Sequence, residues 1–411
     1  MKTSSRSTLI LFTVGTGTAG KHSNLAQGLV NSIRACPLQS TVGLIPSVSP
    51  DSKGIADLVI EELRIDRPDV HVSILASFSD PDDLLACRRE FRALLQTLRQ
   101  TVPCADLTVN PTSGTKQMTA AATLACLDVG MGQIAFITGE RADGVVKTGT
   151  EQVNRVDAAR LQAEQRLQDV LVLLEHGDYA AAERLASLST SFFPFAAAAA
   201  AMLAKWNRLA YTEALKAASD FEVLAESRRV LDRLRAAPDY SVDRAADVLA
   251  LAFREHTYGR PEEALSAIYR AVELLAKVRL SELECAPDCW YAENLIARLK
   301  PEERLKNELI RMQKECPDRP LALGLDKGLR LLEKDRFAFN TISCEDRDIL
   351  RQRNETRFGH GGKCVSPEAV KRLYISVCDK SCDQWPEMKA LLHASVFPDF
   401  APHIRKELNH E

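Results

Sequence analysis

Residues 110–118 read Asn110-Pro111-Thr112-Ser113-Gly114-Thr115-Lys116-Gln117-Met118, and they join an apolar run to an Ala-rich helical pattern at 119–127. Hydroxyl groups, a glycine and a lysine stand together where this helix is expected to begin. The first backbone N–H groups of a helix have no partner within it, so they attract anions. The stretch therefore indicates a strand, a phosphate-type loop and a helix in succession.

The same succession runs through the N-terminal third of the chain. Apolar runs at about 8–14, 41–46, 70–76, 105–109 and 132–138 alternate with helical patterns near 22–34, 51–64, 82–101 and 115–129. This alternation predicts an α/β domain with a parallel, Rossmann-like sheet that helices cover on both faces. In a doubly wound sheet the first and fourth strands flank the point where ligands bind. We therefore expect the loops that follow these two strands to meet.

The loop after the first predicted strand is also rich in glycine and threonine: Gly15-Thr16-Gly17-Thr18-Ala19-Gly20-Lys21-His22-Ser23. It satisfies G-x-G-x-x-G, but the second predicted strand ends Ile45-Pro46-Ser47, without the acidic residue that binds a dinucleotide's ribose. It also approaches G-x-x-x-x-G-K-[ST], but His22 stands where a magnesium-binding hydroxyl belongs. We therefore favour a turn that receives phosphate or ribose oxygens over a dinucleotide or NTPase site. A plain tight turn is the alternative.

A second informative stretch, RNETRFGHGG at 353–362, brings Arg353, Asn354 and His360 within eight residues. The planar fork of Arg binds phosphate oxygens, and the pKa of His suits proton transfer near neutrality. Asn354 could orient either partner, so the set suits RNA cleavage without a metal. On one continuous helix Arg353 and His360 would lie roughly 10 Å apart, but the glycines at 359, 361 and 362 predict a break that brings them closer. The alternative is a polar helix end with a glycine stop.

The composition excludes a protein whose whole surface is basic and binds nucleic acid, because the 411 residues carry a net charge of −3. Positive charge is local: between Arg347 and Arg372, seven Lys and Arg residues face three acidic ones. The apolar stretch at 192–204 is shorter than the roughly 17–20 residues of a membrane span. Eleven cysteines in a chain without an export signal indicate reduced thiols in the cytoplasm. The spacing of Cys285/Cys289 and Cys378/Cys382 is looser than most zinc knuckles, so we expect no metal site.

From about residue 156 the pattern is helical. The segments HGDY at 176–179 and YGRP at 258–261 predict helix–turn–helix joints. In the strongly periodic stretch 264–280, Arg270 and Glu273 stand at i, i+3, so we expect an ordinary ion pair there.

The stretch NPTSGTKQM at 110–118 resembles the signature of CARF domains, the sensor domains of type III CRISPR systems that bind cyclic oligoadenylates. The glycine-rich loop at 15–20 is similar to the other half of that ligand site. Arg353-Asn354 followed by His360 is similar to the R-N-x(4–6)-H signature of HEPN ribonucleases, although RFGHGG is richer in glycine than that family's pattern. Together, and in this order, the two motifs resemble the CARF–HEPN ribonucleases of type III CRISPR immunity.

The resemblance implies a CARF-like domain at 1–155, a helical linker region at 156–245 and an all-α HEPN-like domain at 246–411. It implies a homodimeric endoribonuclease of antiviral defence that needs no cofactor, cuts single-stranded RNA, and is activated allosterically by cyclic oligoadenylate. The implied ligand-binding residues are Gly15, Thr16, Gly17, Thr18, Asn110, Thr112, Ser113, Gly114, Thr115, Lys116 and Gln117, and the implied catalytic residues are Arg353, Asn354 and His360. Two alternatives stay open: a non-enzymatic sensor, and a ring nuclease that degrades the cyclic ligand in the CARF pocket.

Overall fold

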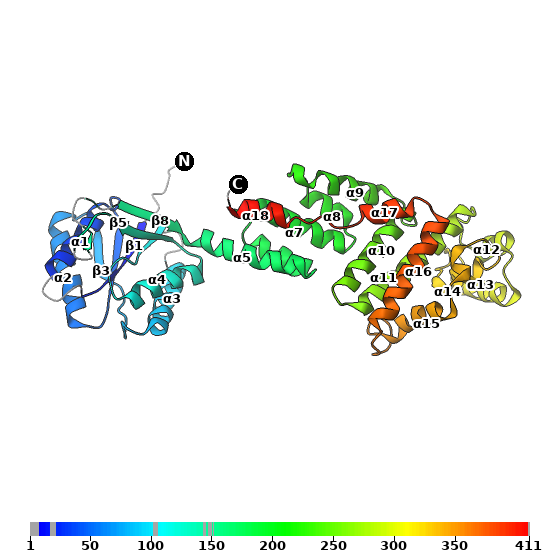
Figure 1. Ribbon diagram of the computed structural model, residues 1–411, viewed down its shortest axis with the longest axis horizontal. Coiled ribbons are helices and arrows are strands. Elements are labelled where there is room, and N and C mark those ends of the chain that lie inside the picture. Colours follow the sequence, from blue (N-terminus) through cyan, green and yellow to red (C-terminus); the bar gives the residue numbers. More distant parts are fainter. Residues whose placement is uncertain are drawn as a thin grey trace. The chain divides into compact units, whose positions relative to one another are not determined.

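The computed structural model describes residues 8–16, 22–101, 106–142, 145–146, 150 and 152–409 (Figure 1). The chain divides into two compact units, residues 1–166 and 167–411. The domain limits expected from the sequence, at 155 and 245, stay predictions. None of the described helices is long and apolar enough to cross a lipid bilayer.

The N-terminal unit contains a six-stranded sheet with the order β3-β2-β1-β4-β5-β8. Five of its strands are parallel: β1 (Thr8–Val14), β2 (Thr41–Pro46), β3 (His71–Ile74), β4 (Asp106–Asn110) and β5 (Gln133–Thr138). The helices between them are α1 (His22–Arg34), α2 (Pro50–Asp66), α3 (Leu84–Thr101) and α4 (Lys116–Val129). The predicted parallel α/β domain is confirmed, with β1 beside β4.

Alternate side chains of β1 face two separate cores, which is why this strand is mostly apolar. Leu9 and Leu11 pack with α3 and α4, whereas Ile10 and Phe12 pack with α1 and α2. In Figure 1 these two helix pairs lie on opposite faces of the sheet. The sheet is therefore covered on both faces, as the alternation predicted.

The sequence did not predict the antiparallel edge strand β8 (Gln152–Asp157), which pairs with β5. It also did not predict the short antiparallel pair of β6 (Arg141–Ala142) and β7 (Val145–Val146). The residues of β8 are QVNRVD, and they are exposed or half-buried. An edge strand with little burial carries no apolar run, so nothing in the sequence marked it.

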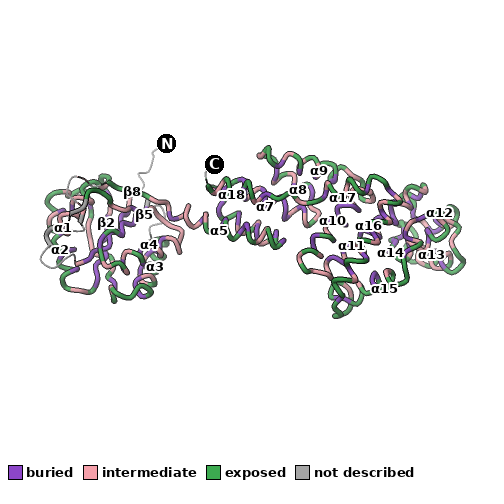
Figure 2. The backbone as a smooth tube through the Cα atoms, viewed as in Figure 1, coloured by how far each residue is buried: buried purple, intermediate pink, exposed green. Residues whose placement is uncertain are grey.

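The second unit is helical. Helix α5 (Ala158–Glu175) begins in the first unit and ends in the second. The further elements of the second unit are α6 (Tyr179–Ser187), α7 (Pro194–Asn207), α8 (Tyr211–Ala217), η1 (Glu222–Leu224), α9 (Ala225–Ala236), α10 (Val242–Thr257), α11 (Pro261–Glu282), η2 (Pro287–Cys289), α12 (Ala292–Leu299), α13 (Glu303–Glu315), α14 (Leu325–Leu331), η3 (Ala338–Thr341), α15 (Cys344–Gln352), η4 (Arg353–Glu355), α16 (Pro367–Gln384), α17 (Met388–Ala394) and α18 (Ala401–Asn409). One large core joins α10, α11, α14 and α16, and in Figure 2 buried stretches alternate with exposed ones along these helices.

Two helix–turn–helix joints are confirmed where glycine was expected to end a helix. Gly177 follows α5 with φ +67°, and Gly259 follows α10 with φ +73°. The two turns also pack together, because the hydroxyls of Tyr179 and Tyr258 are 3.1 Å apart and Arg260 donates to the carbonyl of Gly177 at 3.3 Å. A Cβ on Gly177 would lie 2.2 Å from the Tyr258 ring. The sequence indicated both turns but not their contact.

Candidate functional site

The two glycine-containing loops of the N-terminal unit meet at the carboxyl ends of β1 and β4, as predicted. The hydroxyl of Thr13 donates to the carbonyl of Ser113, and the N–H of Gly15 donates to the Ser113 hydroxyl at 3.1 Å. A Cβ on Gly15 would lie only 2.6 Å from the Cα of Gly114. Glycine is therefore required here for the close approach of the two backbones.

The second loop ends at the N-terminus of α4. Thr115 caps this helix by accepting from the N–H of Met118 at 3.1 Å, and its own hydroxyl donates to the carbonyl of Pro81. The N–H groups of Lys116 and Gln117 precede the first intrahelical bonds, and the side chain of Lys116 is exposed. The helix start therefore offers two N–H donors and a cation to an anionic group.

Several predicted ligand residues have partners inside the domain. The side-chain oxygen of Asn110 accepts from the N–H of Thr112 at 3.1 Å, and the Thr112 hydroxyl accepts from the N–H of Ile137 at 3.2 Å. Asn110 and Ser113 are buried, whereas Thr112 is exposed. The buried members of the set thus hold the shape of the loop. Thr16 is half-buried at the start of the first loop, and the predicted residues Gly17 and Thr18 lie outside the described residues.

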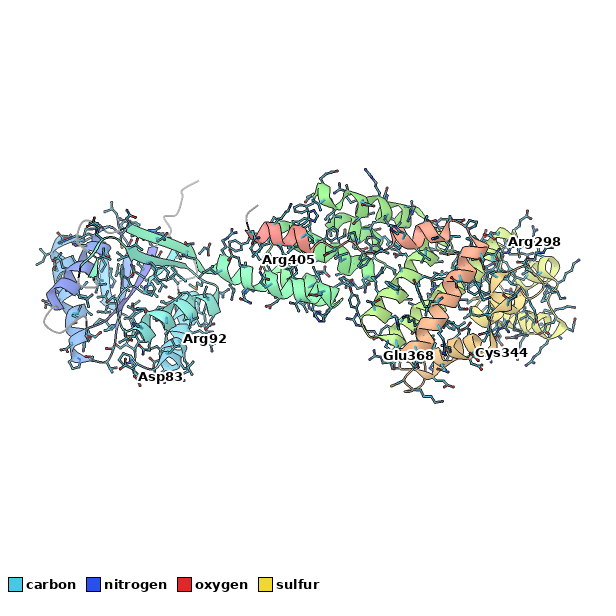
Figure 3. The ribbon with its side chains drawn as sticks, viewed as in Figure 1. Asp83, Arg92, Arg298, Cys344, Glu368 and Arg405 are labelled. Carbon is cyan, nitrogen blue, oxygen red and sulfur yellow. The ribbon has the colours of Figure 1, made fainter. Side chains whose placement is uncertain are left out.

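In the helical unit the RNETRFGHGG stretch leaves its helix and folds back on itself. Helix α15 ends at Gln352, and a 3-10 turn covers Arg353–Glu355. The N–H of His360 donates to the carbonyl of Asn354 at 2.8 Å, and the N–H of Lys363 donates to the carbonyl of Glu355 at 3.0 Å. The predicted break is therefore confirmed, and His360 lies beside Asn354. The loop connects α15 and α16, whose first turns carry Cys344 and Glu368, labelled in Figure 3.

Arg353 is held from two sides. Its Nη1 donates to Oδ1 of Asn354 at 3.2 Å, and its guanidinium carbon lies 5.2 Å from the ring centre of Tyr269 on α11. Burial raises the pKa of Tyr269. Thr356 is fully buried and donates to the carbonyl of Arg353 at 2.8 Å. Asn354 and His360 are exposed, so a half-buried guanidinium stands next to an accessible amide and imidazole.

The sequence did not predict that Tyr269 and Thr356 contact the motif. Both position the motif, one through its ring and the other through its hydroxyl. A tyrosine in an amphipathic helix and a threonine in a polar loop give no signal of such a contact. The ion pair expected between Arg270 and Glu273 is present at 3.1 Å, and Glu273 also pairs with Lys277 at 2.7 Å.

A cavity of about 270 Å³ lies next to the motif and includes Asn354 and Tyr269 in its walls. The other lining residues are leucines, charged residues and one asparagine: Leu325, Asp326, Leu329, Arg330, Glu333, Asn340, Arg347, Leu350 and Arg351. Two nearby positively charged side chains form ion pairs: Arg357 pairs with Glu262 at 2.9 Å, and Lys363 pairs with Glu355 at 2.9 Å. The basic patch of the sequence is thus reduced. Arg347 and Arg351 are exposed at the cavity, where Arg351 pairs with Asp348 at 3.5 Å and Arg347 donates to the carbonyl of Asn340 at 3.1 Å.

In the described part of the chain, no group of three or more His, Cys, Asp and Glu side chains is placed to hold a metal ion. Cys378 and Cys382 stand one turn apart on α16, and burial raises the pKa of Cys378 to about 11. Cys285 is buried and Cys289 is exposed.

Comparison with known proteins relates this site to one family. A family model described as the Csm6 HEPN domain matches residues 234–381, which include all three motif residues. Among solved structures, the chain is similar to Enterococcus italicus Csm6 bound to cyclic hexa-2′-fluoro-hexa-dAMP, with a TM-score of 0.58 and 14% sequence identity over 98% of this chain and 100% of that chain. No curated protein matches the sequence. The resemblance drawn from the two motifs is thus confirmed at the level of the family match and the fold: residues 234–381 match the HEPN domain of Csm6, and the chain has the fold of a Csm6, a mostly parallel α/β unit followed by helices.

Proposed function

We propose that this protein is a CRISPR-associated endoribonuclease that cuts single-stranded RNA when cyclic oligoadenylate binds its N-terminal unit. One observation carries the proposal: the chain folds back after α15 so that His360 bonds to the backbone of Asn354, directly beside Arg353. This arrangement lies in the segment that matches the Csm6 HEPN domain. The Enterococcus italicus protein was solved with a cyclic oligonucleotide, which supports the choice of ligand.

The three motif residues have distinct roles in this proposal. Arg353 binds the scissile phosphate, with Asn354 and Tyr269 fixing the plane of its guanidinium. His360 moves a proton to or from the reacting oxygens. The nucleophile is the substrate's own 2′-hydroxyl, so cleavage leaves a 2′,3′-cyclic phosphate and a free 5′-hydroxyl. DNA, which lacks that hydroxyl, is not cut.

Asn354 and His360 are exposed and Arg353 is half-buried, which fits a site completed by a second copy of the chain. In a two-fold dimer each HEPN domain would contribute one Arg353 and one His360. The cavity beside Asn354 would receive RNA next to the cut, with Arg347 and Arg351 facing the phosphates. The homodimer and the cytoplasmic location remain proposals.

The sensor role rests on the loops at the ends of β1 and β4. They place the N-terminus of α4 and the exposed Lys116 at the crevice where parallel sheets bind ligands. Each phosphate of a cyclic oligoadenylate is an anion that suits this position. Binding can favour the active HEPN arrangement only by as much as the ligand prefers that state.

The deciding experiment measures RNA cleavage, with and without cyclic oligoadenylates, by wild type, His360→Ala and Arg353→Ala. Each variant should lose cleavage while ligand binding and dimerisation persist, and the double variant should be little worse than either single one. His176→Ala and Arg304→Ala, exposed positions away from the motif, are the matched controls. Near-normal cleavage by His360→Ala would end the HEPN assignment.

The same preparations separate the two alternatives. A ring nuclease would degrade the cyclic ligand in both motif variants as fast as in wild type, and a non-enzymatic sensor would cut neither ligand nor RNA. Cleavage should also persist in EDTA, because the proposed chemistry uses the 2′-hydroxyl and side chains alone. Full inhibition by EDTA that magnesium reverses would contradict this part of the proposal.

A further inference from the structure

The cavity beside Asn354 lies between two helical stretches of the second unit, and each of them lines it with one face (Figure 1). From α14 and the turn after it come four residues at positions i, i+3, i+4 and i+7: Asp326, Leu329, Arg330 and Glu333. From α15 and η4 come four residues with the same spacing: Arg347, Leu350, Arg351 and Asn354. Residues at this spacing share one face of a helix, so the two sets form opposite walls of the cavity.

One end of the cavity is next to the RNETRFGHGG motif. Tyr269 lines this end, and its ring centre lies 5.2 Å from the guanidinium carbon of Arg353. Burial is the main cause that raises the pKa of Tyr269, and the nearby carboxylate of Asp326 raises it further. Asp326 is therefore the acidic residue of the α14 wall that lies close to the motif.

Glu333 and Arg347 mark the other end. Asn340 connects them, because its Nδ2 donates to the carbonyl of Glu333 at 3.4 Å and its carbonyl accepts from Nη2 of Arg347 at 3.1 Å. Seven residues separate Glu333 from Asp326, which is two helical turns or roughly 10 Å. The cavity therefore extends away from the motif over a length that suits a nucleotide next to the cut.

The α14 wall offers carboxylate oxygens to the cavity. Asp326 and Glu333 are both exposed. Arg330 stands between them, but it pairs with Glu302 at 2.9 Å and with Glu308 at 3.1 Å, whereas it lies 3.9 Å from Asp326. A carboxylate accepts several hydrogen bonds, so Asp326 can accept from a ligand.

The α15 wall has the opposite charge. Arg347 and Arg351 are exposed, and the pair of Arg351 with Asp348 at 3.5 Å joins two exposed side chains, so it is weak. Leu329 and Leu350 add apolar surface to the two walls. A nucleotide has matching parts: an anionic phosphate, a flat base and a polar base edge. Proteins recognise single-stranded RNA through such base edges.

We propose that Asp326 selects guanine at a nucleotide that flanks the cut. The base lies against Leu329 and Leu350, and its N1–H and N2–H groups donate to the two oxygens of Asp326. The phosphate of the same nucleotide faces Arg351. This inference rests on the proposed function, because it needs RNA bound at the motif.

The choice of guanine follows from the donors on each base. Guanine has two adjacent donors on its Watson–Crick edge, which match the two oxygens of one carboxylate. Adenine and cytosine place a ring-nitrogen acceptor beside their amino group, and uracil places carbonyls on both sides of its N–H. These acceptors would face the carboxylate, so the other three bases are disfavoured.

Cleavage of oligonucleotides that contain a single ribonucleotide tests the base preference. The remaining sugars are deoxyribose, so the proposed chemistry confines the cut to one bond. The four bases are compared on each side of that bond in single turnovers at saturating cyclic oligoadenylate. Guanine at one of the two positions should be cut about tenfold or more faster than adenine, and inosine, which lacks only the N2 amino group, should lose most of this advantage. Equal rates, or a preference for another base, would overturn the proposal.

Variants then assign the preference to Asp326. Asp326→Asn replaces one acceptor oxygen by a donor, so the ratio of the guanine rate to the adenine rate should fall about tenfold. Asp318→Asn, an exposed position outside the cavity lining, is the matched control and should keep the ratio of wild type. Thermal unfolding shows whether each variant is folded. A ratio that survives Asp326→Asn, or that is lost in Glu333→Gln alone, would overturn the assignment.

His360→Ala, measured in parallel on an all-RNA substrate, separates this inference from the proposed function. If wild type cuts RNA and His360→Ala does not, but the base has no effect, the proposed function stands and the inference fails. If wild type cuts no RNA, or His360→Ala cuts it equally well, the proposed function fails and the inference fails with it.

Discussion

The glycines around His360 offer a direct test of how this loop positions the imidazole. A Cβ on Gly359 would lie 2.4 Å from the carbonyl oxygen of Asn354, and one on Gly361 would lie 2.1 Å from that of Glu355. A Cβ on Gly362 would meet nothing within 4 Å. None of the three has a left-handed φ, so alanine is compatible with the backbone conformation itself. Only the contacts distinguish the three positions.

The expected loss of activity follows from these distances. Ordinary contact begins at 3.4 Å, so Gly359→Ala and Gly361→Ala each require a shift of about 1 Å. Both obstructing atoms belong to the backbone, and no change of side-chain rotamer relieves the clash. The shift would stretch the 2.8 Å bond from the N–H of His360 to Asn354 and displace the imidazole. A misplacement of about 1 Å can cost on the order of 100-fold in rate.

The assay compares single-turnover RNA cleavage by the three alanine variants at saturating cyclic oligoadenylate. Gly359→Ala and Gly361→Ala should be about 100-fold slower than wild type, whereas Gly362→Ala should stay within about twofold. Activator affinity and the thermal midpoint should change little, because the loop is exposed. Near-normal cleavage by Gly359→Ala would refute the close packing of the loop. Equal losses at all three positions would show that chain flexibility, rather than contact, is what the glycines supply.

Three further outcomes are expected. Lys116→Ala removes a positive charge at the start of α4, so it should raise the half-activating concentration of cyclic oligoadenylate about tenfold or more without changing the maximal cleavage rate. Unchanged affinity for a labelled ligand would show that Lys116 is not part of the site. Gly177→Ala should lower the free energy of unfolding in urea by about 2–4 kcal/mol, and Gly259→Ala by only about 1 kcal/mol. Both substitutions strain a left-handed backbone conformation, but only the alanine at position 177 would also clash with a neighbouring side chain. Equal losses at the two positions would contradict this explanation. Hydrogen bonds from Arg279, at 2.7 and 3.1 Å, lower the pKa of Asp335. The stabilisation of the folded protein by these bonds should be complete above the ordinary aspartate pKa of about 3.9 and should disappear as the pH falls through the lower pKa that Asp335 has in the folded state. The free energy of unfolding of Asp335→Asn should therefore fall less steeply in acid than that of the wild type.

The sequence by itself determined the architecture of the N-terminal unit. Buried parallel strands are apolar on both faces, and the helices between them are amphipathic. Hydrophobic periodicity and the turn residues between elements therefore located five strands and four helices within a few residues. It also determined which two loops meet, because the order of a doubly wound sheet places β1 beside β4. The strand β8 was not predicted, because an exposed edge strand needs no apolar pattern.

Only the tertiary structure decided how the polar residues are used. The sequence showed three glycines around His360 but not that two of them allow the loop to fold onto the backbone of Asn354 and Glu355. It placed Asn110, Ser113 and Thr115 in one set with Lys116, whereas the structure gives the first three internal partners and leaves the lysine exposed. Contacts such as Arg353 with Tyr269, or Arg254 with Phe397, join residues far apart in the chain. Hydrophobic periodicity records which face of a helix is buried, but not which residue of another helix meets it, and that depends on packing in three dimensions.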